Sequence, residues 1–384
     1  MNETIVIAGA LAQKPRQGGH TWQFLQYLLG FRRLGWEVLF LDQLEPDMCV
    51  DDSGQPCPLE QSVNLRYLVE VMAGFGLQDA YALIYNGGEQ FIGLSRTEVL
   101  ERVRNSAFLL NFMGYLSHAE VLSQARRRVF LDTDPGFGQM WCDLGLADIF
   151  RSHDAYVTIG ENIGQPGCTI PTCGLPWITM RQPVLLAAWP VQTGGEAFTS
   201  IGSWRGPYGP LVYQGKTYGL RVHEFRQFAA LPGLSRQPFQ VALDIHAAEQ
   251  KDIGLLETND WTLVDPKVVT RDPWVYRDYI QSSKAEFMVA KGMYVQANSG
   301  WFSERSMCYL ASGKPVLAQD TGLHGLYPLG EGLLTFRTLA EAQAGVEEIA
   351  GNYARHARAA RALAEEYFAS DKILHGLLEK LGIA

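Results

Sequence analysis

Asn298-Ser-Gly-Trp-Phe-Ser-Glu-Arg-Ser-Met-Cys-Tyr-Leu-Ala-Ser-Gly-Lys-Pro-Val-Leu-Ala-Gln-Asp-Thr-Gly322 is the most informative stretch of the sequence, because it predicts one complete structural unit. The expected elements, in order, are a strand ending at Tyr294 and Val295, a turn at 299–302, a helix from the N-cap Ser303 to about Ser312, a stop at Gly313, and a strand at 315–318. Parallel βα units of this kind build α/β domains in which helices cover a parallel sheet.

The start of this helix is expected to attract an anion. A turn followed by a helix leaves several backbone N–H groups unpaired, and their dipoles favour negative charge. Arg305 follows the N-cap Ser303 within the first turn, where its guanidinium could hold a phosphate through two parallel hydrogen bonds.

The segment Leu310-Ala-Ser-Gly-Lys-Pro-Val316 resembles the donor site of GT-B glycosyltransferases, in particular the group 1 or family 4-like C-terminal domain. The resemblance implies two Rossmann-like β/α/β domains that face each other across a cleft. Two glutamates of the family pattern are missing, because Cys308 and Gly300 stand at their positions. The spacing of Ser303 and Arg305 is similar to a neighbouring subgroup of the same class.

The rest of the sequence agrees with this α/β fold class. Short apolar runs alternate with amphipathic segments, which predicts parallel sheets covered by helices. Expected strands include 5–8, 37–41, 80–85, 108–112, 129–132, 155–159, 198–202, 239–244 and 286–289. We expect an N-terminal acceptor domain at 1–170, a linker at 171–196, a C-terminal donor domain at 197–365, and a final helical segment at 366–384 that crosses back to the first domain.

Candidate residues of the first half follow its first and later strands. Gly18 and Gly19 would let the backbone approach a ligand closely, and His20 could act as a general base. The alternative for His20 is a polar residue near a helix start without chemistry. By resemblance to inverting GT-B enzymes, Asp132 or Asp134 would orient His20, whereas in retaining enzymes the glycine pair would lie against the donor phosphates.

The resemblance also implies a donor site in the second half. Asp320 would read hydroxyls of the transferred sugar, and Lys284 would neutralise the diphosphate, with a solvated lysine as the alternative for Lys284. The full set of donor-binding candidates is Gly18, Gly19, Gly202, Ser203, Trp204, His246, Lys284, Ser299, Gly300, Trp301, Phe302, Ser303, Glu304, Arg305, Asp320, Thr321 and Gly322.

Composition narrows the class of protein. A net charge of −9 argues against a nucleic-acid partner, whose binding surface would be basic. The six cysteines do not form a disulfide framework, and no secretory or membrane segment is apparent, so we expect a cytoplasmic enzyme. A homodimer is compatible with the sequence.

These observations predict a glycosyltransferase that moves a sugar from a UDP-, dTDP- or GDP-linked donor to a small-molecule acceptor. No metal or cofactor is expected, because N–H groups and Arg305 would stabilise the leaving diphosphate. The Asp132-Thr-Asp134 spacing suits a metal but lies in the expected acceptor domain. His20 and the missing glutamates favour inversion. A sugar-nucleotide epimerase or hydrolase, and a non-catalytic binding protein on the same fold, are the alternatives.

Overall fold

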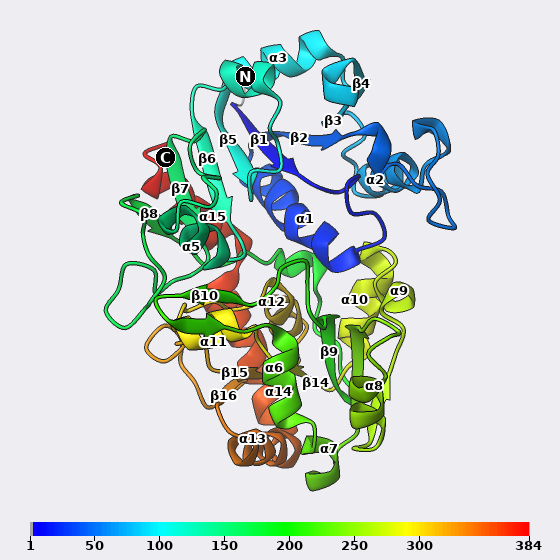
Figure 1. The fold of residues 1–384 in the computed structure, drawn as a ribbon, viewed down its shortest axis with the longest axis vertical. Coiled ribbons are helices and arrows are strands. Elements are labelled where there is room, and N and C mark those ends of the chain that lie inside the picture. The colour runs from blue at the N-terminus through cyan, green and yellow to red at the C-terminus, as the bar shows by residue number, and fades with distance from the viewer. Residues whose placement is uncertain (1–2, 384) are drawn as a thin grey trace.

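The computed structural model describes residues 3–383, which form two α/β halves stacked along the long axis of the molecule (Figure 1). The first half contains an eight-stranded sheet in the order β4-β3-β2-β1-β5-β6-β7-β8. Its strands are β1 Thr4–Gly9, β2 Glu37–Leu44, β3 Tyr81–Tyr85, β4 Gln90–Gly93, β5 Ser106–Phe112, β6 Arg128–Asp132, β7 Ala155–Thr158 and β8 Trp177–Thr179. All neighbours in this sheet are parallel except β3 and β4.

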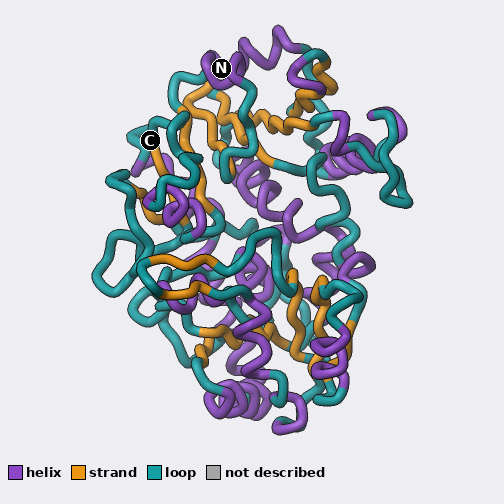
Figure 2. Tube along the Cα trace, in the orientation of Figure 1, coloured by secondary structure: helices purple, strands orange, loops and turns teal. Residues whose placement is uncertain are grey.

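Helices connect these strands, and two of them begin at serine caps. The helices are α1 Gly18–Arg33, α2 Val63–Gly74, α3 Arg96–Arg104, α4 Ala119–Gln124 and α5 Phe137–Asp143. Ser62 caps α2 by accepting a hydrogen bond from the backbone N–H of Leu65, and Ser95 with Glu98 forms a reciprocal capping box at α3. Figure 2 shows this alternation of strand and helix along the chain.

The second half contains a six-stranded parallel sheet in the order β13-β12-β9-β14-β15-β16 and a separate hairpin, β10 with β11. Its strands are β9 Phe198–Ser203, β10 Leu211–Tyr213, β11 Lys216–Tyr218, β12 Phe239–Asp244, β13 Trp261–Leu263, β14 Ala285–Met288, β15 Val316–Gln319 and β16 Leu333–Phe336. Its helices are α6 Arg221–Phe225, α7 Leu231–Leu234, α8 Gln250–Glu257, α9 Pro266–Val269, α10 Pro273–Ser282, α11 Gly292–Ala297, α12 Glu304–Ala311, α13 Leu339–Gly351, α14 Tyr353–Leu363 and α15 Ser370–Lys380.

The structure differs from the sequence-based expectation in several places. Residues 292–297, expected to end a strand, form the helix α11, which stops at Asn298 in the left-handed conformation. The strand β8 lies inside 171–196, the range expected to be only a linker, and it completes the edge of the first sheet. Short elements such as α5 and β4 were not expected at all.

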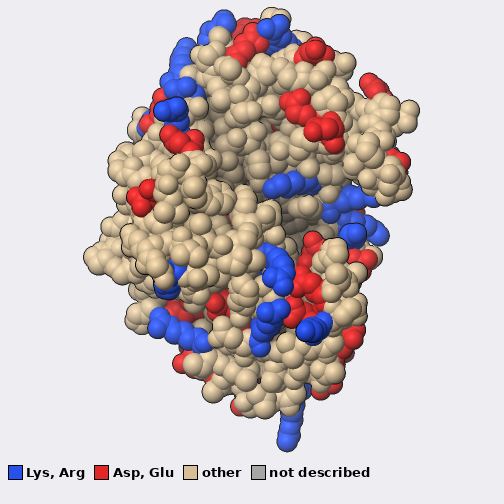
Figure 3. Space-filling model, in the orientation of Figure 1, with Lys and Arg blue, Asp and Glu red and all other residues tan. Residues whose placement is uncertain are grey.

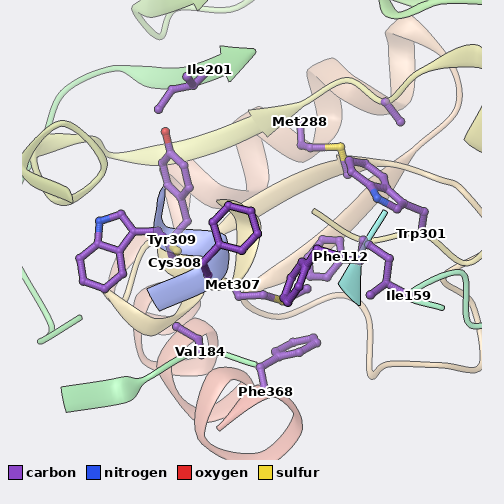
Figure 4. Packing of buried hydrophobic residues seen from close by; sticks show 14 of the residues in the cluster. Phe112, Ile159, Val184, Ile201, Met288, Trp301, Met307, Cys308, Tyr309 and Phe368 are labelled. Carbon is purple, nitrogen blue, oxygen red and sulfur yellow. The ribbon is translucent and has the colours of Figure 1, made fainter. Parts of the chain in front are cut away.

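The two halves share one apolar core. Figure 4 shows Phe112 and Ile159 of the first half in the same packed cluster as Met288 and Met307 of the second half. The last helix, α15, packs on α1, because a Cβ atom at Gly30 would lie 2.5 Å from Leu374. Lys380 also donates to the carbonyl of Thr179, 2.8 Å away. The chain therefore crosses between the halves twice.

Candidate functional site

The carboxyl ends of the two sheets face each other. The loop after β1 meets the start of α10, where the N–H of Gly18 donates to the carbonyl of Thr270 at 2.6 Å. Asp134, just after β6, forms an ion pair with Lys291, just after β14, at 2.6 Å. Ligands of doubly wound folds bind at these strand ends. Figure 3 shows the surface hollowed between the halves, with basic side chains beside the hollow.

Two buried arginines lie against the second sheet, Arg221 at its carboxyl end and Arg305 with its guanidinium on Glu286 of β14. Arg221 donates from Nε to the carbonyl of Val289 and from Nη1 to that of Ser203, at 3.0 Å each. Arg305, on α12, donates from Nε to Oε1 of Glu286 at 2.6 Å. Burial, followed by the nearby charge of Arg305, lowers the pKa of Arg221 to about 10. The charges of the two arginines therefore influence each other, and guanidinium groups are suited to binding an anion.

Glu286 keeps Arg305 charged and in place. Its side chain is 0% exposed and that of Arg305 is 7% exposed. Burial disfavours the charged form of Arg305, but the Glu286 carboxylate outweighs this effect, so the pKa of Arg305 is raised. Within the described part of the chain, the terminal nitrogens of Arg305 make no hydrogen bond, so the guanidinium can still donate to a ligand.

Gly202 makes room for Arg221. A Cβ atom at Gly202 would lie 2.0 Å from Nη1 of Arg221. The expected role of Gly202, Ser203 and Trp204 in direct donor contact is therefore revised. Ser203 supplies a carbonyl to Arg221, and Trp204 is buried in the core, where its indole N–H donates to Asp252 at 2.8 Å.

The turn before α12 is closed to ligands in this structure. Ser303 caps the helix as expected, accepting from the N–H of Arg305 at 3.3 Å. Every residue from Ser299 to Ser303, including Gly300, Trp301 and Phe302, is buried. Asn162 of the first half covers the turn by donating to the carbonyls of Asn298 and Gly322. The expected anion site at the backbone of this helix start is thus corrected, because the turn is covered by protein.

Other expected donor contacts are occupied by protein partners. Asp320 accepts from the N–H groups of Gly322 and Leu323 and pairs with Arg337 at 2.6 Å. The hydroxyl of Thr321 donates to the carbonyl of Trp301. The Asp320 carboxylate therefore organises its own loop, which leaves it little capacity to read a sugar.

Three other expected donor-site residues, and one of the two positions where the family has a glutamate, do not lie in one shared pocket. Lys284 precedes β14, at the opposite end of the sheet from the cleft, and binds Gln237 at 2.6 Å. His246 is exposed and accepts from the N–H of Ala248. Glu304 lies near Gln182, with 3.5 Å between Oε2 and Nε2. Cys308, at a usual glutamate position, is buried beside Gln26 of α1, so it contacts the other half and not a ribose.

Asp132 and Asp134 do not orient His20. The buried Asp132 accepts from Gln139 at 2.6 Å and from Thr158 at 2.9 Å, and burial raises the pKa of Asp132 to about 6. Asp134 accepts from Lys291 and from the hydroxyl of Tyr294, both in the second half. These carboxylates stabilise a strand end and the contact between halves, respectively.

Gly18 and Gly19 serve the same contact. A Cβ atom at Gly18 would lie 2.3 Å from the carbonyl oxygen of Asp272, and one at Gly19 would lie 2.9 Å from the ring of Tyr276. The two glycines thus allow α1 to approach α10 closely. In this structure they contact the second half of the protein, where a donor phosphate had been expected.

His20 is the one expected catalytic residue of the first half whose reactive atom is unpaired. Within the described residues, its buried Nε2 has no hydrogen-bond partner. The ring packs edge-on against Phe24 and Tyr115, and the ammonium of Lys14 donates to the hydroxyl of Tyr115 at 2.6 Å. Burial, followed by the charge of Lys14, lowers the pKa of His20 to about 3. His20 is therefore neutral at pH 7 and able to accept a proton.

His20 is expected to titrate far below the ordinary value for histidine, about 6.5. The unfolded chain binds a proton at His20 below about pH 6.5, and the folded chain does so only near pH 3. The free energy of unfolding should therefore decrease as the pH falls through this window. Long-range ¹H–¹⁵N spectra of the imidazoles over this pH range measure the titration. Lys14→Met should raise the pKa of His20, and an ordinary His20 titration in the unmodified protein would contradict the geometry.

Several site residues escaped sequence reasoning. Arg221 follows the hairpin in a short helix, and nothing near it marks a ligand site. Glu286 lies inside a buried strand, where a carboxylate signals a buried partner, and this signal could have been used. Lys291, which follows β14, was the better candidate than Lys284, because only the carboxyl end of a parallel strand faces the cleft.

Comparison with known proteins places this arrangement among glycosyltransferase folds. No protein-family model and no curated protein sequence matches the chain. An alpha-glucosyltransferase in complex with UDP aligns over 100% of both chains with a TM-score of 0.56 and 11% identity. AviGT4, a glycosyltransferase of avilamycin A biosynthesis, aligns with a TM-score of 0.52 and 13% identity over 98% of this chain and 96% of its own. Sucrose-phosphate synthase from Thermosynechococcus elongatus gives 0.55 and 11% over 99% of each chain. The expected GT-B fold is confirmed.

One expectation about partners is wrong. An alpha-glucosyltransferase in complex with UDP and a 13-mer DNA aligns over 100% of both chains, with a TM-score of 0.59 and 10% identity. A chain of this fold can therefore bind DNA, and the net charge of −9 does not exclude a nucleic-acid partner, because a local basic surface is sufficient. Separately, no helix among residues 3–383 is long and apolar enough to cross a membrane.

Proposed function

We propose that this protein is a glycosyltransferase that takes its sugar from a nucleoside diphosphate sugar, with UDP as the preferred nucleoside diphosphate. The observation that supports this proposal most strongly is a pair of buried guanidinium groups, that of Arg221 at the carboxyl ends of β9 and β14 and that of Arg305 on Glu286 of β14. Solved structures of the same fold include an enzyme bound to UDP. A leaving diphosphate carries the charge that such a pair would bind.

In this proposal the second half stabilises the leaving group. When the bond between the sugar and the diphosphate breaks, negative charge develops on the phosphate oxygens, and preorganised donors lower the free energy of that transition state. Arg221 is held by two carbonyls and Arg305 by Glu286, so both are oriented before the substrate binds. With two guanidinium groups available, transfer would proceed without a metal ion.

The first half would activate a small hydroxyl-bearing acceptor. His20 is neutral, and its Nε2 is free to take the hydroxyl proton as the acceptor oxygen attacks the anomeric carbon, which would invert that centre. A pKa near 3 makes a weak base, but a bound diphosphate would offset the charge of Lys14 and raise the pKa of His20.

A donor screen tests the proposal. The purified protein is incubated with UDP-, dTDP- and GDP-sugars, and both thermal unfolding and release of the nucleoside diphosphate are measured. We expect UDP and a UDP-sugar to raise the unfolding temperature and release of UDP to depend on an added acceptor. Release without acceptor would favour a hydrolase or epimerase, sugar transfer to DNA would replace the small acceptor, and the absence of any nucleotide binding would contradict the proposal.

A further inference from the structure

A second pocket lies at the amino end of β14, the opposite end of the second sheet from the cleft. It has a volume of about 760 Å³ and lies between α14 and the segment 191–195, which leads from the first half into β9. Lys284 lines the pocket and directly precedes β14, so the pocket lies at the amino end of that strand. A pocket of this size can hold a small organic ligand.

The cations around this pocket lack carboxylate partners. Lys284 is hydrogen-bonded to the neutral Gln237 at 2.6 Å, and Lys314, which is fully buried, to the carbonyl of Gly194 at 2.9 Å. Arg358, exposed on α14, forms no ion pair with any described residue; Arg361 is the exception, because it pairs with Glu365. Burial lowers the pKa of Lys314 to about 8 and also lowers that of Lys284. A nearby anion would remove this electrostatic cost.

The rest of the lining is apolar or aromatic. Val191 comes from the connecting segment, and Tyr353, Ala354 and Ala357 come from two successive turns of α14. Val191 is 51% exposed, although apolar side chains of this size are usually covered. The pocket thus offers an apolar wall beside unpaired positive charge.

We propose that this pocket binds a small amphiphilic organic anion. Its acidic group would lie between Lys284 and Arg358, and its apolar part would cover Val191 and Ala357. The occupant would touch both α14 and the segment that connects the halves, so it would act at a distance from the catalytic cleft. This inference does not depend on the proposed sugar transfer.

Binding of 1-anilinonaphthalene-8-sulfonate to the full-length protein tests the site, because this dye combines a sulfonate with an apolar body. We expect saturable fluorescence enhancement, with Lys284→Met and Arg358→Met each weakening the affinity at least fivefold. Ala357→Trp should fill the pocket and abolish the binding while it leaves the cations in place. UDP should not displace the dye, because the cleft is elsewhere.

Arg355→Met is the matched control, since Arg355 is also exposed on α14 but pairs with Glu331. It should bind the dye like the unmodified protein. Thermal unfolding checks that each variant is folded. Equal dye affinity in the unmodified protein, Arg358→Met and Ala357→Trp, or displacement of the dye by UDP, would overturn the proposal.

Discussion

Arg305→Met is expected to abolish sugar transfer and also to destabilise the protein strongly. Glu286 is 0% exposed, and its second oxygen, Oε2, has no hydrogen-bond partner among the described residues. Removal of Arg305 would leave this carboxylate buried and unpaired, which costs about 3–5 kcal/mol in comparable pairs. The free energy of unfolding in urea measures the loss.

A double variant separates stability from function. Arg305→Met with Glu286→Leu replaces both charges by apolar groups, so it should recover most of the lost stability but none of the transfer activity. Arg355→Met provides the control for a half-exposed pair, where a loss of at most about 1 kcal/mol is expected. Full activity in the double variant would show that Arg305 is only structural.

Arg221→Met is expected to lower kcat/KM for the nucleotide sugar by about 10²–10³-fold, the range found for loss of one oxyanion donor. Its guanidinium is fixed by the carbonyls of Ser203 and Val289 and lies over Gly202. Gly202→Ala should cause a similar but smaller loss, because the new methyl group would displace the same guanidinium.

Gly254→Ala is the matched control for this pair. Gly254 lies in α8, and nothing would lie within 4 Å of its added Cβ atom, so activity should be unchanged and stability equal or slightly higher. Steady-state kinetics with varied donor concentration measure all three variants. If Gly202→Ala matches Gly254→Ala in activity, the position of Arg221 does not matter for the reaction.

Local sequence signals predicted most of the fold because they act over a few residues. Ser303 caps α12, and Gly313 ends it with a φ of +71°, which a glycine tolerates best. The segment 292–297 was predicted wrongly because Tyr294 and Val295 favour strands, whereas contacts with both halves hold the segment in a helix.

The candidate site was harder to predict because its parts come from distant segments. Arg221, Glu286 and Arg305 lie on three separate elements, and their proximity depends on the order of strands in the sheet. Backbone features of the 299–303 turn were visible in the sequence, but their burial under Asn162 was not. A site whose residues come together only in the folded protein produces no short motif that can be recognised in the sequence.

The packing of α15 on α1 also constrains when the first half can finish folding during translation. Leu374, Leu377 and Leu378 of α15 are buried, and Leu374 lies against Gly30 of α1. While the nascent chain is still on the ribosome, α1 must therefore wait with part of its apolar surface uncovered until residues 370–380 have emerged. Folding of the first half becomes complete only after translation of the second, and a fragment that stops before α15 should aggregate or recruit chaperones.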